Sequence, residues 1–102
     1  MDIKAIKAQV RDGNFVVSAH ADQEAADEGI DIVEIRDAIL NGEILESYSN
    51  TGRGTSCLIL GFVDDNPIHV VCGWRRESVV IVTVYIPKPP KFEDPWTRRR
   101  LS

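Results

Sequence analysis

The sequence has only two cysteines, and none of its apolar runs approaches the roughly 20 residues of a membrane span. Two cysteines are too few for a disulfide framework, so Cys57 and Cys72 are expected to be reduced thiols packed within apolar strands. The charged first residues also lack the apolar segment of a signal peptide. We therefore expect a cytoplasmic protein with no membrane partner.

Common catalytic and metal-binding motifs are missing as well. The two histidines and two cysteines show none of the Cys-x-x-Cys or His-x(3–5)-His spacings of zinc sites. There is no glycine-rich phosphate loop, serine nucleophile elbow or carboxylate pair. We therefore expect no metal and no cofactor, so that any catalysis depends on the side chains of the protein alone.

The net charge of −4 conceals an uneven distribution of charged residues. Residues 12–46 hold ten acidic residues against one basic residue, Arg36, whereas residues 47–102 hold eight basic residues against five acidic ones. An acidic N-terminal part is thus joined to a mildly basic C-terminal part. This asymmetry is compatible with a nucleic-acid site on one face, although most charged stretches are solvated surface.

Helical patterns precede strand-like patterns in a chain whose length suits one domain. Three short helices are predicted, with Asp2, Ser18 and Asp31 as N-caps, and the segment NFVVS is a brief strand or an extended lead-in. Four strand-like runs follow, joined by short turns that favour antiparallel neighbours: EILESYS, SCLILGFV, PIHVVCGW and VVIVTVYIP. We predict an α+β fold in which two to three N-terminal helices pack on one face of a four-stranded antiparallel sheet.

The C-terminal residues differ in composition from the strands before them. Residues 88–102 are interrupted by prolines and carry a surplus of basic side chains. We predict that residues 1–102 form one domain and that 88–102 form its basic C-terminal arm. Phe92 and Trp96 are the candidate anchors of this arm.

An ordered set of short elements resembles a known family. The elements are a helix-initial histidine, a Gly-Ile pair before the next helix, and three short strand motifs: His20, Gly29 with Ile30, Asn41 to Glu43, Pro67 to Val70, and Thr83 to Tyr85. Over about residues 15 to 100 the sequence resembles a bacterial family known as domain of unknown function 4258. It departs from the family at Glu24, where members usually carry an arginine.

The resemblance implies a fold and a function. Members look like small toxins with the RelE-like fold of RelE and MqsR, and they are often encoded beside an antitoxin. The implied activity is metal-independent cleavage of mRNA by a toxin of a toxin–antitoxin system, with RNA as substrate and an antitoxin as protein partner. The alternative is a non-catalytic module of the same fold that binds an antitoxin-like partner, which the acidic Glu24 favours.

Metal-free RNA cleavage requires a base, an acid and cations beside the phosphate. The candidate acid and base are His69 and His20, and Tyr85 would donate or orient a proton. The whole catalytic set is His69, His20, Tyr85 and Thr83. The candidate substrate-binding cations are Arg53, Arg75, Arg76, Arg98, Arg99 and Arg100.

The position of His69 depends on the loop RRES between two predicted strands. A loop of odd length places His69 opposite Thr83 or Tyr85, whereas a two-residue loop places it opposite a valine. The structural alternative for His69 is a half-buried histidine whose ring nitrogens are satisfied by Tyr85, Thr83 or a backbone group. His20 likewise has a structural interpretation, as a helix-terminal residue that makes a local hydrogen bond.

Overall fold

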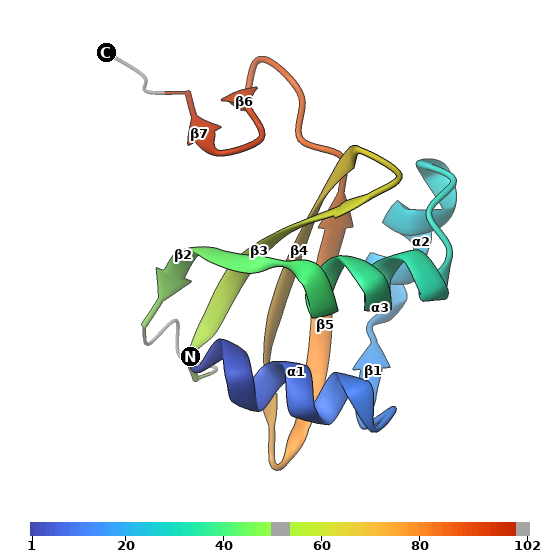
Figure 1. Cartoon of the computed structure of the whole chain (residues 1–102), viewed down its shortest axis with the longest axis vertical. Coiled ribbons are helices and arrows are strands. Elements are labelled where there is room, and N and C mark those ends of the chain that lie inside the picture. The colour runs from blue at the N-terminus through green and yellow to red at the C-terminus, as the bar shows by residue number, and fades with distance from the viewer. Residues whose placement is uncertain (50–53, 100–102) are drawn as a thin grey trace.

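Three helices and seven strands make up the described part of the chain, residues 1–49 and 54–99, in a computed structural model (Figure 1). The helices are α1 (Ile3–Arg11), α2 (Ala19–Asp27) and α3 (Ile32–Asn41), and the strands are β1 (Phe15–Val17), β2 (Glu43–Tyr48), β3 (Ser56–Val63), β4 (Asn66–Arg75), β5 (Ser78–Tyr85), β6 (Phe92–Asp94) and β7 (Thr97–Arg98). No helix in these residues is long and apolar enough to cross a membrane.

The sheet is mixed and has five strands in the order β1-β5-β4-β3-β2. Strands β2 to β5 form an antiparallel meander, and β1 adds to its edge by pairing in parallel with β5. The four-stranded antiparallel sheet of a RelE-like toxin fold, which we predicted, is therefore wrong for this chain. Strands β6 and β7 form a separate two-stranded sheet within the C-terminal arm.

Strand β1 was not predicted as part of the sheet because it is only three residues long. Three residues are too few to display the alternating pattern of a strand. The partner of β1 is also distant in sequence, since Phe15 lies opposite Val79. The segment that we described as a brief strand or an extended lead-in is therefore a strand, and only the parallel pairing with β5 reveals it.

The local signals at the helix N-termini predicted the helices correctly. The side chains of Asp2, Ser18 and Asp31 each accept a hydrogen bond from a backbone N–H in the first turn of α1, α2 and α3. Asp31 also forms a capping box with Glu34. These bonds satisfy backbone donors that have no partner inside a helix, and so they fix where each helix begins.

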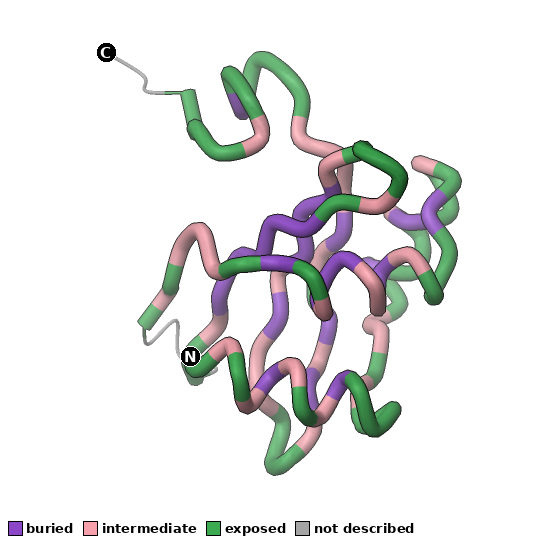
Figure 2. The backbone as a smooth tube through the Cα atoms, viewed as in Figure 1, coloured by how far each residue is buried: buried purple, intermediate pink, exposed green. Residues whose placement is uncertain are grey.

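One face of the sheet shares a hydrophobic core with all three helices. The buried residues of β3, β4 and β5 on this face form one cluster with buried residues of α1, α2 and α3. Figure 2 shows the buried stretches of these strands and helices in purple. Helix α3 approaches β3 very closely, because a Cβ atom added to Gly61 would lie 1.9 Å from the carbonyl oxygen of Ala38. Only glycine fits at that point of β3.

The opposite face of the sheet is called here the arm-side face, because the C-terminal arm packs on part of it. It carries two neighbouring rows of side chains: Leu60 of β3, His69 of β4 and Tyr85 of β5 lie opposite one another, and Glu46 of β2 lies opposite Leu58 of β3. Leu58 and His69 are fully buried there, outside the core that the helices share. This second, smaller cluster contains the candidate site.

Candidate functional site

A β-bulge in β5 sets the position of His69. The loop between β4 and β5 has two residues, since Arg75 lies opposite Ser78. Such a loop alone would place His69 opposite a valine. The register shifts by one residue between Cys72 and Val71 of β4, with Val82 as the extra residue on β5, and His69 consequently lies opposite Tyr85. The bulge, rather than the loop that we considered, brings these two side chains together.

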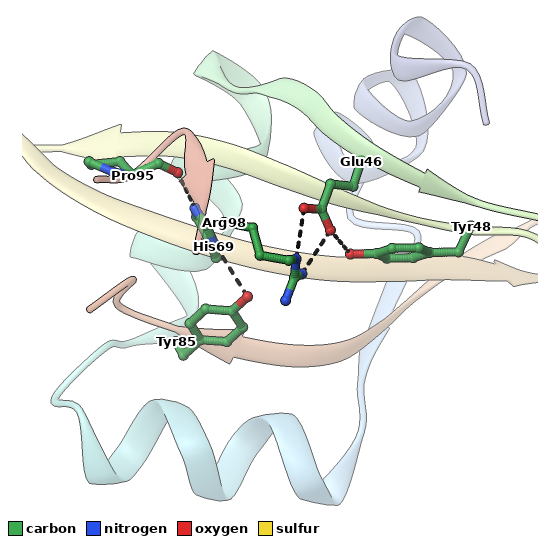
Figure 3. A network of polar contacts seen from close by, with 6 residues as sticks. All are labelled: Glu46, Tyr48, His69, Tyr85, Pro95 and Arg98. Carbon is green, nitrogen blue, oxygen red and sulfur yellow. Dashed lines mark hydrogen bonds and ion pairs between the residues drawn. The ribbon is translucent and has the colours of Figure 1, made fainter. Parts of the chain in front are cut away.

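The His69 ring is fully buried, and both of its nitrogens have a partner (Figure 3). Nε2 lies 2.6 Å from the carbonyl oxygen of Pro95, and Nδ1 lies 3.3 Å from the hydroxyl oxygen of Tyr85. A carbonyl oxygen can only accept, so Nε2 carries the proton and Nδ1 accepts the hydrogen bond that Tyr85 donates. A hydrogen-bonded chain thus runs from the half-exposed Tyr85 through His69 to the arm.

Aromatic packing closes the site above His69. The ring of Phe92, from β6, meets the His69 ring edge-on with 4.5 Å between the ring centroids. Phe92 is 1% exposed, whereas Trp96 is 52% exposed and contacts Phe62, with ring centroids 5.6 Å apart. Both aromatic residues therefore join the arm to the sheet, as we predicted from the sequence.

The environments of His69 and Tyr85 keep both side chains neutral near pH 7. Burial lowers the pKa of His69, while the hydrogen bond to Pro95 and the negative charge of Glu46 oppose this shift. Burial likewise raises the pKa of Tyr85. The phenol therefore keeps its proton, and the imidazole has an unprotonated Nδ1 that can receive one.

A second polar group lies beside the pair and holds the arm to β2. Arg98 donates to both carboxylate oxygens of Glu46, over 2.8 and 3.0 Å, and the hydroxyl of Tyr48 donates to the same carboxylate. The bonds from Arg98 hold the pKa of Glu46 below its ordinary value. Burial, together with the hydrogen bond to Glu46, raises the pKa of Tyr48 to about 12. This network fixes where the Arg98 guanidinium lies.

Three cations of the arm line one cavity, and one of them, Lys91, lies over the ring of Tyr85. A cavity of about 430 Å³ is lined by Pro90, Lys91, Arg98 and Arg99. The Lys91 ammonium lies 5.6 Å from the centre of the Tyr85 ring. The arrangement can therefore hold an anion beside the exposed end of the hydrogen-bonded chain.

Comparison with known proteins identifies the family. A family described only as a domain of unknown function, DUF4258, matches residues 17–86. The chain belongs to the DUF4258 family. Neither a curated protein nor a solved structure matches the chain.

The site straddles the border of the DUF4258 match. His69 and Tyr85 lie within residues 17–86, as does Glu46. Pro95 and Arg98, which complete the contacts of these side chains, lie beyond the match. The DUF4258 part thus supplies the imidazole, the phenol and the carboxylate, and the C-terminal arm supplies the groups that cover and charge the site.

The other candidate catalytic residues lie outside this cluster. Thr83 lies opposite Val71, on the same face as His69 but without a hydrogen bond to it. The His20 side chain is 70% exposed on α2, and its Nε2 lies 3.2 Å from a carboxylate oxygen of Glu24. The same oxygen of Glu24 also accepts from the backbone N–H of Val84, next to Tyr85. In this DUF4258 domain, Glu24 therefore satisfies a backbone donor of β5 at the buried Val84, beyond the last residue that pairs with β1.

The candidate cations are divided between two ends of the sheet. Arg98 and Arg99 lie in the arm, where both line a cavity with Lys91. Arg75 and Arg76 lie at the β4–β5 turn, six residues along β4 from His69, or about 20 Å at the usual rise of a strand (Figure 1). Arg53 and Arg100 fall outside the described residues.

Several residues of the site were missed by sequence reasoning. Pro95 acts through its backbone carbonyl, which no sequence pattern reveals. Lys91 gave no signal beyond its charge. Glu46 and Tyr48 were not among the predicted residues. The alternation in EILESYS could have suggested them only if the β-bulge at Leu45 had been recognisable. In the described residues, no group of three or more histidine, cysteine or acidic side chains could hold a metal ion.

Proposed function

We propose that this DUF4258 domain is a metal-independent endoribonuclease that cleaves mRNA as the toxin of a toxin–antitoxin pair. The observation that carries the proposal is the chain of hydrogen bonds from Tyr85 through His69 to Pro95, which ends beside a cavity lined by three cations. It supplies a proton acceptor and a phosphate-binding group without a metal.

The proposed chemistry uses Tyr85 as the group that touches the substrate. The 2′-hydroxyl of the RNA gives its proton to the Tyr85 oxygen while Tyr85 passes its own proton to Nδ1 of His69. The 2′-oxygen then bonds to phosphorus, and the bond from phosphorus to the 5′-oxygen breaks. The leaving 5′-oxygen takes a proton from the Lys91 ammonium or from water, which leaves a 2′,3′-cyclic phosphate and a 5′-hydroxyl.

Charges around the site support both ends of this proton transfer. The imidazolium formed at His69 would be stabilised by its hydrogen bond to Pro95 and by the nearby carboxylate of Glu46. Negative charge developing on the phosphate would meet Lys91 and Arg99, while Arg98 beside them is already paired with Glu46. Tyr85 is partly exposed, and the proposed chemistry requires the substrate to reach its hydroxyl oxygen while the arm covers His69.

The test is cleavage of mRNA, free and on ribosomes, by the full-length protein at micromolar concentration. We expect Tyr85→Phe to lower the rate by about 100-fold, the scale of general acid–base catalysis. Lys91→Gln should also slow cleavage, whereas Lys4→Gln, a matched change on the exposed side of α1, should not. Intact RNA with wild-type protein, or equal rates for wild type and Tyr85→Phe, would contradict the proposal.

A second candidate function is a non-catalytic module that binds an antitoxin-like protein. The observation in its favour is that His69 is fully buried and holds the arm in place, which is a sufficient structural reason for this residue. Glu24, bonded to Val84, similarly has a structural use. Co-expression with the product of the neighbouring reading frame, followed by size-exclusion chromatography, tests this function. A stable complex together with uncut RNA would favour it over the enzyme.

A further inference from the structure

A groove crosses the β4–β5 hairpin, far from the arm. Two adjoining cavities, of about 480 and 400 Å³, share Arg75 and Val80 in their walls. We call them together the hairpin groove, and the residues that matter for its chemistry are Val71, Gly73, Arg75, Arg76, Val80 and Val82. Part of the groove lies on the arm-side face of the sheet, beyond the part that the arm covers.

The floor of the hairpin groove is unusually apolar for an uncovered sheet face. An antiparallel sheet with one solvated face normally alternates apolar residues inward with polar residues outward. Here Val71, Val80 and the 42%-exposed Val82 face the groove instead. Gly73 has no side chain, so the backbone lies open between these valines. A Cβ atom at this position would lie 3.3 Å from the carbonyl oxygen of Thr55. A flat, apolar body could rest directly on this surface.

The wall of the groove is cationic in a protein whose net charge is −4. No acidic side chain lines either cavity, and Arg75 and Arg76 form no ion pair with any residue among 1–49 and 54–99. Both arginines are exposed. Arg98, by contrast, is already neutralised by Glu46. The hairpin groove thus offers two unpaired guanidinium groups to an anion.

The backbone of Arg76 adopts a left-handed conformation. Arg76 occupies the first position of a two-residue hairpin turn and has φ +59°. Glycine is preferred at this position in turns whose first residue alone has a positive φ. A residue other than glycine in this conformation is strained, and such strain is found at functional positions. Arginine here places a second charge beside Arg75 that glycine could not provide.

We propose that the hairpin groove binds a nucleotide of single-stranded RNA, with the base on the floor formed by Val71, Gly73 and Val80 and the phosphate on Arg75 and Arg76. This inference rests on the proposed ribonuclease function and adds a substrate requirement to it. Along β4 the groove extends from Val71, about 7 Å from His69, to Arg75, about 20 Å from it, so a phosphate bound at the arginines is remote from the scissile phosphate. Good substrates are therefore unpaired strands long enough to span both sites.

Binding is tested on the full-length Tyr85→Phe protein, so that cleavage does not interfere. Adenosine 5′-monophosphate, adenosine and inorganic phosphate are titrated separately while backbone amide shifts are followed by NMR. We expect the nucleotide to bind more tightly than either fragment and to shift the amides of β4 and β5 around Gly73. The double variant Arg75→Gln with Arg76→Gln should weaken binding by about tenfold, whereas Arg11→Gln on α1 should not.

The outcomes separate this inference from the proposed function. Nucleotide binding at the groove combined with uncut RNA would support the groove and overturn the enzyme. Cleavage that depends on Tyr85 but is unchanged in the double arginine variant, for short and long RNA alike, would overturn the groove. Shifts caused by an acidic peptide but not by the nucleotide would also overturn it, because they would identify the groove as a protein-binding surface.

Discussion

Replacing His69 with phenylalanine removes two buried hydrogen bonds while nearly preserving the volume of the side chain. Pro95 would lose the donor 2.6 Å from its carbonyl oxygen, and the hydroxyl of Tyr85 would lose its acceptor. Each such bond contributes about 1 kcal/mol, so we expect the free energy of unfolding to fall by about 2 kcal/mol. The edge-on contact with Phe92 should survive, since phenylalanine can make the same ring contact.

A comparison with His69→Ala separates hydrogen bonding from packing. Alanine loses the same two bonds and also leaves a cavity beneath Phe92, so the total loss should rise to about 4 kcal/mol. Urea unfolding at pH 7.5 measures both values. Chymotrypsin sensitivity at Phe92 measures whether the arm has detached. If His69→Phe unfolds within about 0.5 kcal/mol of wild type, with Phe92 equally protected, the hydrogen bonds of His69 do not hold the arm.

Two further predictions concern stability. Burial lowers the pKa of His69 in the folded protein. Below about pH 6.5 the histidine therefore becomes protonated in the unfolded chain before it does so in the folded protein, and this difference destabilises the fold. The advantage of wild type over His69→Phe should therefore be complete above pH 6.5 and shrink towards pH 5 in urea unfolding, and a constant difference would contradict this. Gly61→Ala should cost about 3 kcal/mol or more in thermal or urea unfolding because its Cβ would overlap Ala38, whereas Gly73→Ala, on the arm-side face, should cost far less. Equal losses would refute the close approach of α3 to β3.

Signals within a few residues in sequence predicted most of the elements. The N-cap at Ser18 and the capping box of Asp31 with Glu34 indicated the helix starts, and the short turns between the strand-like runs predicted the meander of β2 to β5. Pairings over long sequence distances were not predictable in this way. The parallel pairing of Phe15 with Val79 and the contact of Pro95 with His69 each depend on tertiary packing that leaves no local pattern.

Sequence identified His69 and Tyr85 as a candidate pair but could not establish that they meet. The missing information was the register between β4 and β5. The two-residue loop within RRES would by itself place His69 opposite Val84 rather than Tyr85. The four strand-like runs and their short turns predicted a sheet that lacks β1. The expected ribonuclease chemistry also directed attention to Arg75 and Arg76 as partners of His69, although the structure places them at the other end of β4. Their position instead defines the hairpin groove.

The two β-bulges explain how an irregular sheet assembles the site. Strict alternation from the buried Val79 would turn Tyr85 towards the helices, and strict alternation from Glu43 would do the same to Glu46. A phenol and a carboxylate would then enter an apolar core, where unpaired polar groups are strongly destabilising. One extra residue in each strand, Val82 in β5 and Leu45 in β2, returns both side chains to the arm-side face. The polarity of these two side chains therefore selects the bulged registers, and the same registers bring them to His69 and Arg98.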